Sequence, residues 1–245
     1  MFAWIAPAGF LDKMTAMRLL LTNDDGIDAP GLRALEELCG EYDPVVVAPD
    51  RQYSACGHQA TTRAPIPAAQ QSDRRWCVSG TPVDCVRLGL TRFAPDTEVV
   101  IAGINPGGNL GVDLYMSGTV AAAREAALFG RRAIAISHYC GKGRLPDWDL
   151  ARARLLPVLG DLLARPHTPG TFWNVNLPHP EHDDPTPEAV PCDPDPQGLE
   201  IHFEEQAGGW LYAGDYHARP RTPGHDVDVC LGGRIAVSLI PIRGQ

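Results

Sequence analysis

The sequence lacks long hydrophobic runs and an excess of basic residues. No apolar stretch approaches the roughly 20 residues that span a bilayer. The opening stretch, MFAWIAPAGFLDKMTAM, has neither a basic region nor a sustained apolar core, which argues against a secretory signal. The formal net charge is −9, so most of the surface would repel a nucleic-acid polymer. We therefore expect a soluble, cytoplasmic protein that binds neither a membrane nor a nucleic-acid polymer.

Clustered cysteines and several common enzyme signatures are also missing. The seven cysteines are scattered and form no C-x-x-C pair, which is typical of reduced thiols and argues against a zinc site built on sulfur. There is no G-x-x-x-x-G-K-[ST] loop, no G-x-G-x-x-G after the first expected strand and no G-x-S-x-G elbow. These absences exclude a P-loop nucleotidase and disfavour a dinucleotide-binding fold.

Apolar, strand-like runs alternate with helix-like segments along most of the chain. The expected strands are 17–22, 44–48, 76–78, 97–103, 132–137 and 172–177. The expected helices are one that begins near Pro30, then 82–90, 117–129 and 149–164. Such alternation predicts right-handed βαβ units, and hence an α/β fold with a mostly parallel sheet covered by helices on both faces.

The character of the chain changes after this alternating region. Residues 178–198 are rich in Pro and Asp and are not expected to form a regular element. The segments WLYAGDYHA and RIAVSLIPI indicate antiparallel strands or an arm. We therefore divide the chain into an N-terminal extension (1–16), a catalytic core (17–178), and a C-terminal β-rich arm with a closing strand (179–245). The extension is interpreted as a loose segment or as a result of start-site choice.

Three polar segments directly follow expected strands, where ligands bind in an open parallel sheet. They supply Asp24 and Asp25 (TNDDG), Ser54 and His58 (APDRQYSACGH), and Asn105 and Asn109 (GINPGGNLG). Two adjacent carboxylates raise each other's pKa, and a hard divalent cation would remove that repulsion. The same pair could instead cap the following helix. Spacing alone leaves both interpretations open.

The remaining candidates each have a simpler structural interpretation. Ser54 is typical of a turn, His58 of a surface or packing histidine, and asparagines in such loops of turn conformations. Ser117, Gly118 and Thr119 open the helix expected at 117–129. The free N–H groups at a helix start form a phosphate cradle, although plain N-capping by Ser117 explains the same residues.

Four blocks in order resemble the SurE family of survival-protein nucleotidases. They are LLLTNDDGIDAPGLRAL, VVVAPDRQYSACGHQAT, SGTPVDCVRLGL and VVIAGINPGGNLGVDLYMSGTVAAAREAALFGRRAIAIS, and FWNVNLP continues the likeness. The resemblance implies a Rossmann-like core and a metal-dependent phosphatase that acts on nucleoside 5′- and 3′-monophosphates. It also implies a homodimer or homotetramer that exchanges C-terminal arms.

The resemblance also implies a set of site residues. The ligands of one divalent metal ion per subunit, such as Mg²⁺ or Mn²⁺, would be Asp24, Asp25, Ser54 and Asn105. The phosphate side would be formed by Asn109, Ser117, Gly118 and Thr119. On this hypothesis Asp24 and Asp25 are the catalytic residues, and Asp25 orients or deprotonates the attacking water.

Three alternatives remain at this point. An aspartate could act as the nucleophile and form an aspartyl-phosphate, although that scheme usually places its two aspartates one residue apart. The protein could sense a nucleotide or another phosphate metabolite without significant catalysis. A purely structural role would leave the polar strand ends unexplained.

Overall fold

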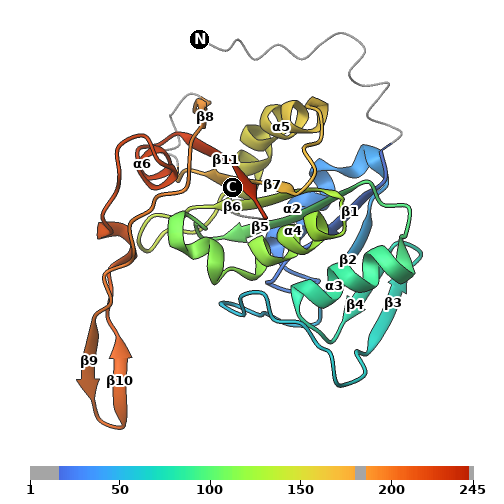
Figure 1. Ribbon diagram of the computed structural model, residues 1–245, viewed down its shortest axis with the longest axis horizontal. Coiled ribbons are helices and arrows are strands. Elements are labelled where there is room, and N and C mark those ends of the chain that lie inside the picture. Colours follow the sequence, from blue (N-terminus) through green and yellow to red (C-terminus); the bar gives the residue numbers. More distant parts are fainter. Residues whose placement is uncertain (1–16, 180–185, 243–245) are drawn as a thin grey trace.

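The computed structural model describes residues 17–179 and 186–242, so the extension expected for residues 1–16 lies outside the described part. Within that part, nine strands form one sheet in the order β3-β4-β2-β1-β5-β6-β7-β11-β8 (Figure 1). The strands are β1 Leu19–Thr22, β2 Val45–Pro49, β3 Ala68–Ser72, β4 Arg75–Val78, β5 Val99–Pro106, β6 Arg132–His138, β7 Thr171–Leu177, β8 Ala189–Pro191 and β11 Ile235–Pro241. The helices are α2 Pro30–Leu38, α3 Pro82–Leu88, α4 Gly118–Leu128, α5 Trp148–Ala164 and α6 Asp226–Leu231.

The central strands β4, β2, β1, β5, β6 and β7 all run parallel to one another. The edge strand β3 joins β4 in the antiparallel direction, as β11 joins β7. The expected mostly parallel α/β sheet with a Rossmann-like arrangement is therefore confirmed. All the carboxyl ends of the parallel strands, including those of β2, β1 and β5, meet at one edge of the sheet.

Two apolar cores lie on opposite faces of the sheet. One core packs α2 and α5 against it through side chains such as Leu32, Leu35 and Leu155. The other packs α3 and α4 through residues such as Val86 and Val120. Because helices cover both faces, the inner strands are apolar on both sides, which explains runs such as Leu19–Leu21 and Val99–Ala102.

Several boundaries differ from those expected. The strand β3 (AAQQS) was not predicted, because its residues are all exposed and have little β-propensity, and only pairing with β4 defines it. The prediction of no regular element in 178–198 was wrong at β8, which pairs with β11 at the sheet edge and ends at a proline that an edge tolerates. The strand β5 continues to Pro106, so Asn105 belongs to the strand end. Helix α3 ends at Leu88 and is followed by a π-helical turn, Gly89–Phe93.

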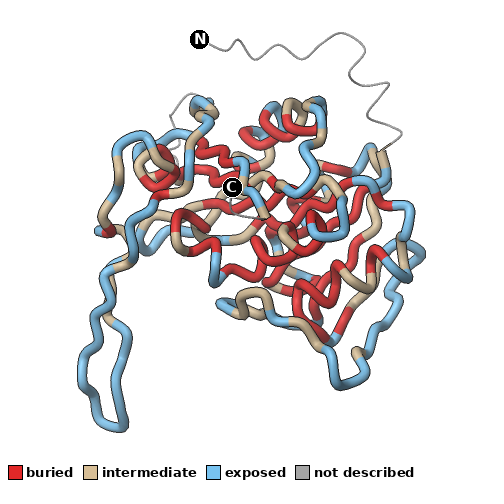
Figure 2. Tube along the Cα trace, viewed as in Figure 1, coloured by how far each residue is buried: buried red, intermediate tan, exposed pale blue. Residues whose placement is uncertain are grey.

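The C-terminal part divides between a protruding hairpin and a return to the sheet. Strands β9 (Phe203–Gln206) and β10 (Gly209–Tyr212) pair only with each other, antiparallel, and extend away from the body (Figure 1). Their residues are exposed (Figure 2). The antiparallel pairing expected for WLYAGDYHA and RIAVSLIPI is thus found in β10 and in β11. No helix in the described ranges is long and apolar enough to cross a membrane.

Candidate functional site

The polar segments predicted from the sequence follow three neighbouring strands. Strand β1 lies between β2 and β5 in the sheet. Thr22 of β1 pairs with Ala102 of β5, so Asp25 and Asn105 each lie three residues beyond a paired position. The sheet therefore brings these segments to one edge, as expected for a ligand site in an open parallel sheet.

Asp24 lies at the N-terminus of α4. It is only 6% exposed, and the Thr119 hydroxyl donates a hydrogen bond to its Oδ1. Burial raises the pKa of Asp24, although hydrogen bonds from Thr119 and from the backbone of Gly118 act in the opposite direction. The structure thus joins two groups that the sequence suggested separately, the aspartates and the start of α4.

Asp25 is the less satisfied of the two aspartates. Burial and the neighbouring charge of Asp24 raise the pKa of Asp25 to about 7, and the amide of Gln52 donates to its Oδ1 over 3.3 Å. Its Oδ2 is buried and has no hydrogen-bond partner among the described residues. A buried carboxylate oxygen of this kind, beside a second carboxylate, fits a bound divalent cation.

The alternative that the aspartates cap the next helix is wrong. Helix α2 begins at Pro30, its N-cap is Ala29, and its first turn contains no acidic residue. Asp25 lies four residues before that cap. The turn between them is held instead by Asn23, whose side chain bonds both the N–H and the carbonyl of Gly26.

The loop that contains Ser54 is attached to both of the elements that form the site. The Tyr53 N–H donates to the Asp24 carbonyl over 2.7 Å, and the Gly57 N–H donates to the Met116 carbonyl over 2.9 Å. Ser54 lies between these two attachments and is exposed. The preceding residue, Tyr53, is bonded to Asp24, but no hydrogen bond joins the Ser54 side chain to either aspartate.

Asn105 is oriented by a local bond at the end of β5. Its Nδ2 donates to the Gly107 carbonyl over 2.9 Å, which does not use the acceptor oxygen Oδ1. The described part of the chain contains no group of three or more His, Cys, Asp or Glu side chains that could hold a metal. Asp24, Asp25, Ser54 and Asn105 carry carboxylate, hydroxyl and amide oxygens, which are donor types that hard cations such as Mg²⁺ accept.

Asn109 is 7% exposed and is fixed by residues that the sequence analysis did not identify. Its Nδ2 donates to Ser137 Oγ over 2.7 Å, and its N–H donates to Asn176 Oδ1 over 2.8 Å. Asn174 and Asn176 both donate to its carbonyl. The alternating NVN of β7 could have indicated the contacts of Asn174 and Asn176, because two asparagines on one face of a buried strand require polar partners.

Ser117 acts as the N-cap of α4, with its Oγ accepting from the Val120 N–H over 3.1 Å. The capping interpretation is therefore confirmed. The other N–H groups of this helix start also have partners: the Ser117 N–H donates to the Asp113 carbonyl over 3.0 Å, and the backbone of Gly118 and of Thr119 bonds the Asp24 carboxylate. An anion bound at this helix start would therefore share the Gly118 and Thr119 N–H groups with Asp24.

His58 lies outside this arrangement and has a structural contact. Its Nε2 lies 2.8 Å from Oε2 of the buried Glu125, which Arg87 also contacts. Burial alone would raise the pKa of Glu125, but His58 and Arg87 together lower it. The interpretation of His58 as a packing residue accounts for this contact.

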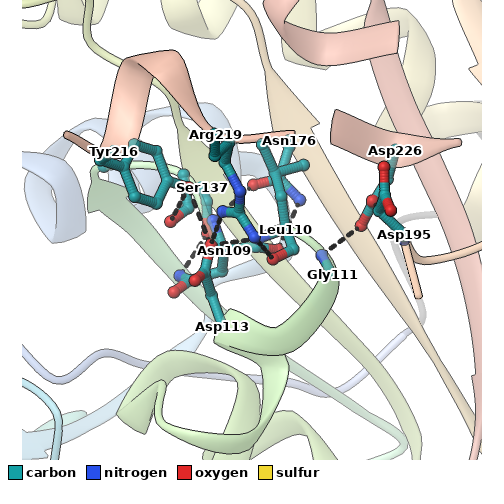
Figure 3. A network of polar contacts seen from close by, with 12 residues as sticks. Asn109, Leu110, Gly111, Asp113, Ser137, Asn176, Asp195, Tyr216, Arg219 and Asp226 are labelled. Atoms are coloured by element: carbon teal, nitrogen blue, oxygen red, sulfur yellow. Dashed lines mark hydrogen bonds and ion pairs between the residues drawn. The ribbon is translucent and has the colours of Figure 1, made fainter. Parts of the chain in front are cut away.

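A second polar network joins the C-terminal segment to the loop after Asn109 (Figure 3). The Asp226 carboxylate accepts from the N–H groups of Gly111 and Asp195, each over 2.8 Å. Arg219 and Tyr216 contact Asp113 in the same region. These residues lie more than 80 positions from the loop they contact, so local sequence patterns gave no indication of them.

Known proteins resemble this chain in sequence. The family model of the survival protein SurE matches residues 19–191. A protein from Synechocystis sp. named "Putative 5'-nucleotidase" is 48% identical over 226 residues, which is 92% of this chain and 100% of that protein. The 5'-nucleotidase SurE of Methylobacterium radiotolerans is 37% identical over 240 residues, 93% of each chain.

The fold agrees as well. The crystal structure of the SurE protein from Aquifex aeolicus has a TM-score of 0.80 and 28% identity, with coverage of 93% of this chain and 94% of that chain. The family model spans well over half of the 245 residues and includes both aspartates and the start of α4. The chain therefore belongs to the SurE family.

Proposed function

We propose that this protein is a nucleotidase that hydrolyses nucleoside 5′- and 3′-monophosphates to nucleoside and phosphate, with one divalent metal ion per subunit. The observation that supports this most directly is the contact between buried Asp24 and the N-terminus of α4. Asp24 and its neighbour Asp25 suit a cation, and the helix start that Asp24 contacts suits a phosphate. The curated relatives are named as 5'-nucleotidases, which favours the 5′ position.

The proposed phosphate contacts come from α4 and from Asn109. The proposed phosphate residues Ser117, Gly118 and Thr119 lie at the positive end of the α4 dipole, which would stabilise charge on the transferring phosphoryl group. The phosphate would share the N–H groups of Gly118 and Thr119 with Asp24, which they also bond. Asn109 has two donor hydrogens on Nδ2, and the bond to Ser137 uses one of them. The second would donate to a phosphate oxygen.

The proposed metal ligands are Asp24, Asp25, Ser54 and Asn105. When bound, the ion would supply Lewis-acid polarisation of the phosphate and lower the pKa of a water. Asp25 would orient the attacking water and accept its proton on the carboxylate. Asp24, held by Thr119, keeps the pair of carboxylates in place.

The test is phosphate release from nucleoside 5′- and 3′-monophosphates with Mn²⁺ or Mg²⁺, repeated with excess chelator. We expect release that stops in chelator and returns when metal is restored. Tight binding of nucleotide without release would instead identify a sensor. Acid quench under single turnover, followed by mass analysis of the protein, then separates direct attack by water from an aspartyl-phosphate, because only the latter adds a phosphoryl group to the protein.

We also propose that the hairpin mediates assembly into a homodimer or homotetramer. The hairpin carries four large apolar side chains that are 46–68% exposed: Phe203, Trp210, Leu211 and Tyr212. Exposed apolar side chains grouped on one element are typical of an interaction surface, whereas single scattered ones are not. On this proposal the described part of 179–245 acts as an arm, while β11 closes the sheet of the catalytic core. A cytoplasmic location is proposed from the seven free cysteines.

A further inference from the structure

Two residues of the segment after the hairpin contact the backbone on either side of Asn109. The Tyr216 hydroxyl oxygen lies 3.1 Å from the Gly108 carbonyl oxygen, and its one proton is shared between that carbonyl and the Asp113 carboxylate. Arg219 Nη2 donates to the carbonyl of Leu110 over 3.3 Å. Figure 3 shows both side chains on the same side of the Asn109 loop. Both backbone neighbours of a proposed phosphate ligand are thus held from outside the catalytic core.

The same two side chains meet at Asp113. Its Oδ2 accepts from Tyr216 over 2.8 Å, from Arg219 over 2.7 Å and from the Leu110 N–H over 3.1 Å. Arg219 is 4% exposed and Asp113 is 7% exposed, so the ion pair is buried. Burial lowers the pKa of Arg219, but the Asp113 carboxylate outweighs this and raises it overall. Burial of a charged pair is costly unless its hydrogen bonds are satisfied, and here one oxygen receives three.

Gly108 and Tyr216 are in tight contact. A Cβ atom on Gly108 would lie 2.9 Å from the Tyr216 hydroxyl. Separately, Asn174 and Asn176 of β7 hold the Asn109 carbonyl. Both the sheet and the C-terminal segment therefore hold this loop.

We propose that Tyr216 and Arg219 are positioning residues for the reaction, because they fix the Gly108–Asp113 loop and with it the amide of Asn109. This rests on the proposed function only in taking Asn109 as a phosphate contact. The C-terminal segment would then contribute to turnover through an intramolecular contact, separate from any part in assembly. Displacement of a binding group by about 1 Å can reduce a rate about a hundredfold. Loss of the Tyr216 or the Arg219 contact is therefore expected to lower the rate measurably.

The test compares Tyr216→Phe with the matched variant Tyr139→Phe. Tyr139 belongs to the same aromatic cluster, and its hydroxyl bonds His217 over 2.7 Å instead of the Asn109 loop. A second pair is Arg219→Lys and Arg221→Lys, since Arg221 is exposed and lies two residues further along. Each variant is assayed for kcat and KM, for inorganic phosphate binding by calorimetry, and for thermal unfolding.

We expect Tyr216→Phe to lower kcat/KM about tenfold and to weaken phosphate binding, with Tyr139→Phe close to wild type. If Tyr216→Phe lowers only the melting temperature and leaves kinetics and phosphate binding unchanged, the residue is structural and the inference is wrong. If Arg219→Lys does not fold, Tyr216→Phe alone decides.

Failure of the proposed function would look different. A wild-type protein that releases no phosphate but binds inorganic phosphate would refute the nucleotidase proposal. Phosphate binding by the same variants would still test whether Tyr216 and Arg219 position the Asn109 loop. If the wild type is active, Asn109→Ala is inactive and Tyr216→Phe keeps its activity, only the positioning role of Tyr216 and Arg219 is refuted.

Discussion

Gly118 and Asp24 approach each other so closely that no side chain fits between them. A Cβ atom on Gly118 would lie 2.8 Å from both the Cβ and Oδ2 of Asp24, and 3.0 Å from the Cys56 sulfur. Gly118 is the first residue of α4 and has an ordinary helical backbone, so the requirement is for space and not for an unusual φ. The distance between aspartate and helix N-terminus therefore depends on the absence of one methyl group.

Gly118→Ala is accordingly expected to separate Asp24 from α4. We expect a fall in kcat/KM of about a hundredfold, because both metal and phosphate groups shift relative to each other. Gly40→Ala is the control, since a Cβ there meets nothing within 4 Å. Equal rates in the two variants would show that the contact does not matter for turnover.

Asp25→Asn tests the proposed proton acceptor. The amide keeps the size of the carboxylate but cannot accept a proton at neutral pH, so we expect phosphate release to fall by about 10²–10⁴-fold while the fold stays intact. Asp28→Asn is a suitable control, because the Asp28 side chain is 72% exposed. Circular dichroism checks the fold, and a wild-type rate in Asp25→Asn would refute the assignment.

The raised pKa of Asp25 also predicts how the metal-free protein responds to pH. Its pKa is about 7 in the folded state against 3.8 for the ordinary group, because burial and Asp24 disfavour the charged form. The folded state therefore holds a proton that the unfolded state has lost between these values. The contribution of Asp25 to the free energy of unfolding is therefore fully present below pH 3.8. It falls as the pH rises from 3.8 and is lost as the pH rises through 7.

Urea unfolding in excess chelator from pH 4.5 to 8 measures this effect. We expect the free energy of unfolding of wild type to fall across the range, and that of Asp25→Asn to fall less. Addition of Mn²⁺ at pH 8 should recover stability in wild type, since a cation stabilises the paired carboxylates. Parallel curves for the two proteins would contradict the assignment of the raised pKa.

The parts of the structure that were predictable are those with a local sequence signal. The runs that became β1, β2, β5 and β6 are apolar because both faces of these strands are covered, and this makes them recognisable. Strands β3 and β8 have no such signal, since exposed or short segments become strands only through pairing.

The site followed the same rule. The aspartates and Ser117–Thr119 stand at strand and helix ends that a sequence pattern can locate. Tyr216 and Arg219 reach the loop after Asn109 across more than 100 residues, and only the folded chain brings them there. The sequence therefore did not indicate the residues that hold the Asn109 loop, whereas it did indicate those proposed to contact the metal and the phosphate.

The protruding hairpin gives a prediction about assembly. Trp210 is 68% exposed on β10, and Trp210→Ser removes the largest apolar side chain of the hairpin. We expect light scattering after size exclusion to show a smaller species, or a weaker concentration dependence, than wild type. Leu145→Ser, at an 86% exposed residue in the loop before α5, should leave the molar mass unchanged. If both variants match wild type, the hairpin is not the contact.

His138 predicts a separate loss of stability in acid. It is 2% exposed at the end of β6, and its Nδ1 has no hydrogen-bond partner among the described residues. Burial, with the nearby charge of His179, lowers its pKa from 6.5 to about 4. As the pH falls, the unfolded state therefore binds a proton before the folded state does. The contribution of His138 to the free energy of unfolding is fully present above pH 6.5 and is lost as the pH falls through 4.

The expected loss is on the order of 3 kcal/mol between pH 7 and pH 4, since one pKa unit corresponds to about 1.4 kcal/mol. Other groups titrate in the same range, so the informative quantity is the difference in pH slope between wild type and His138→Gln. Glutamine stays neutral throughout, and its curve should be flatter by that amount even if the variant is less stable at pH 7. Identical slopes would mean that His138 gains its proton as easily in the folded protein as in the unfolded chain, which its burial next to His179 should prevent.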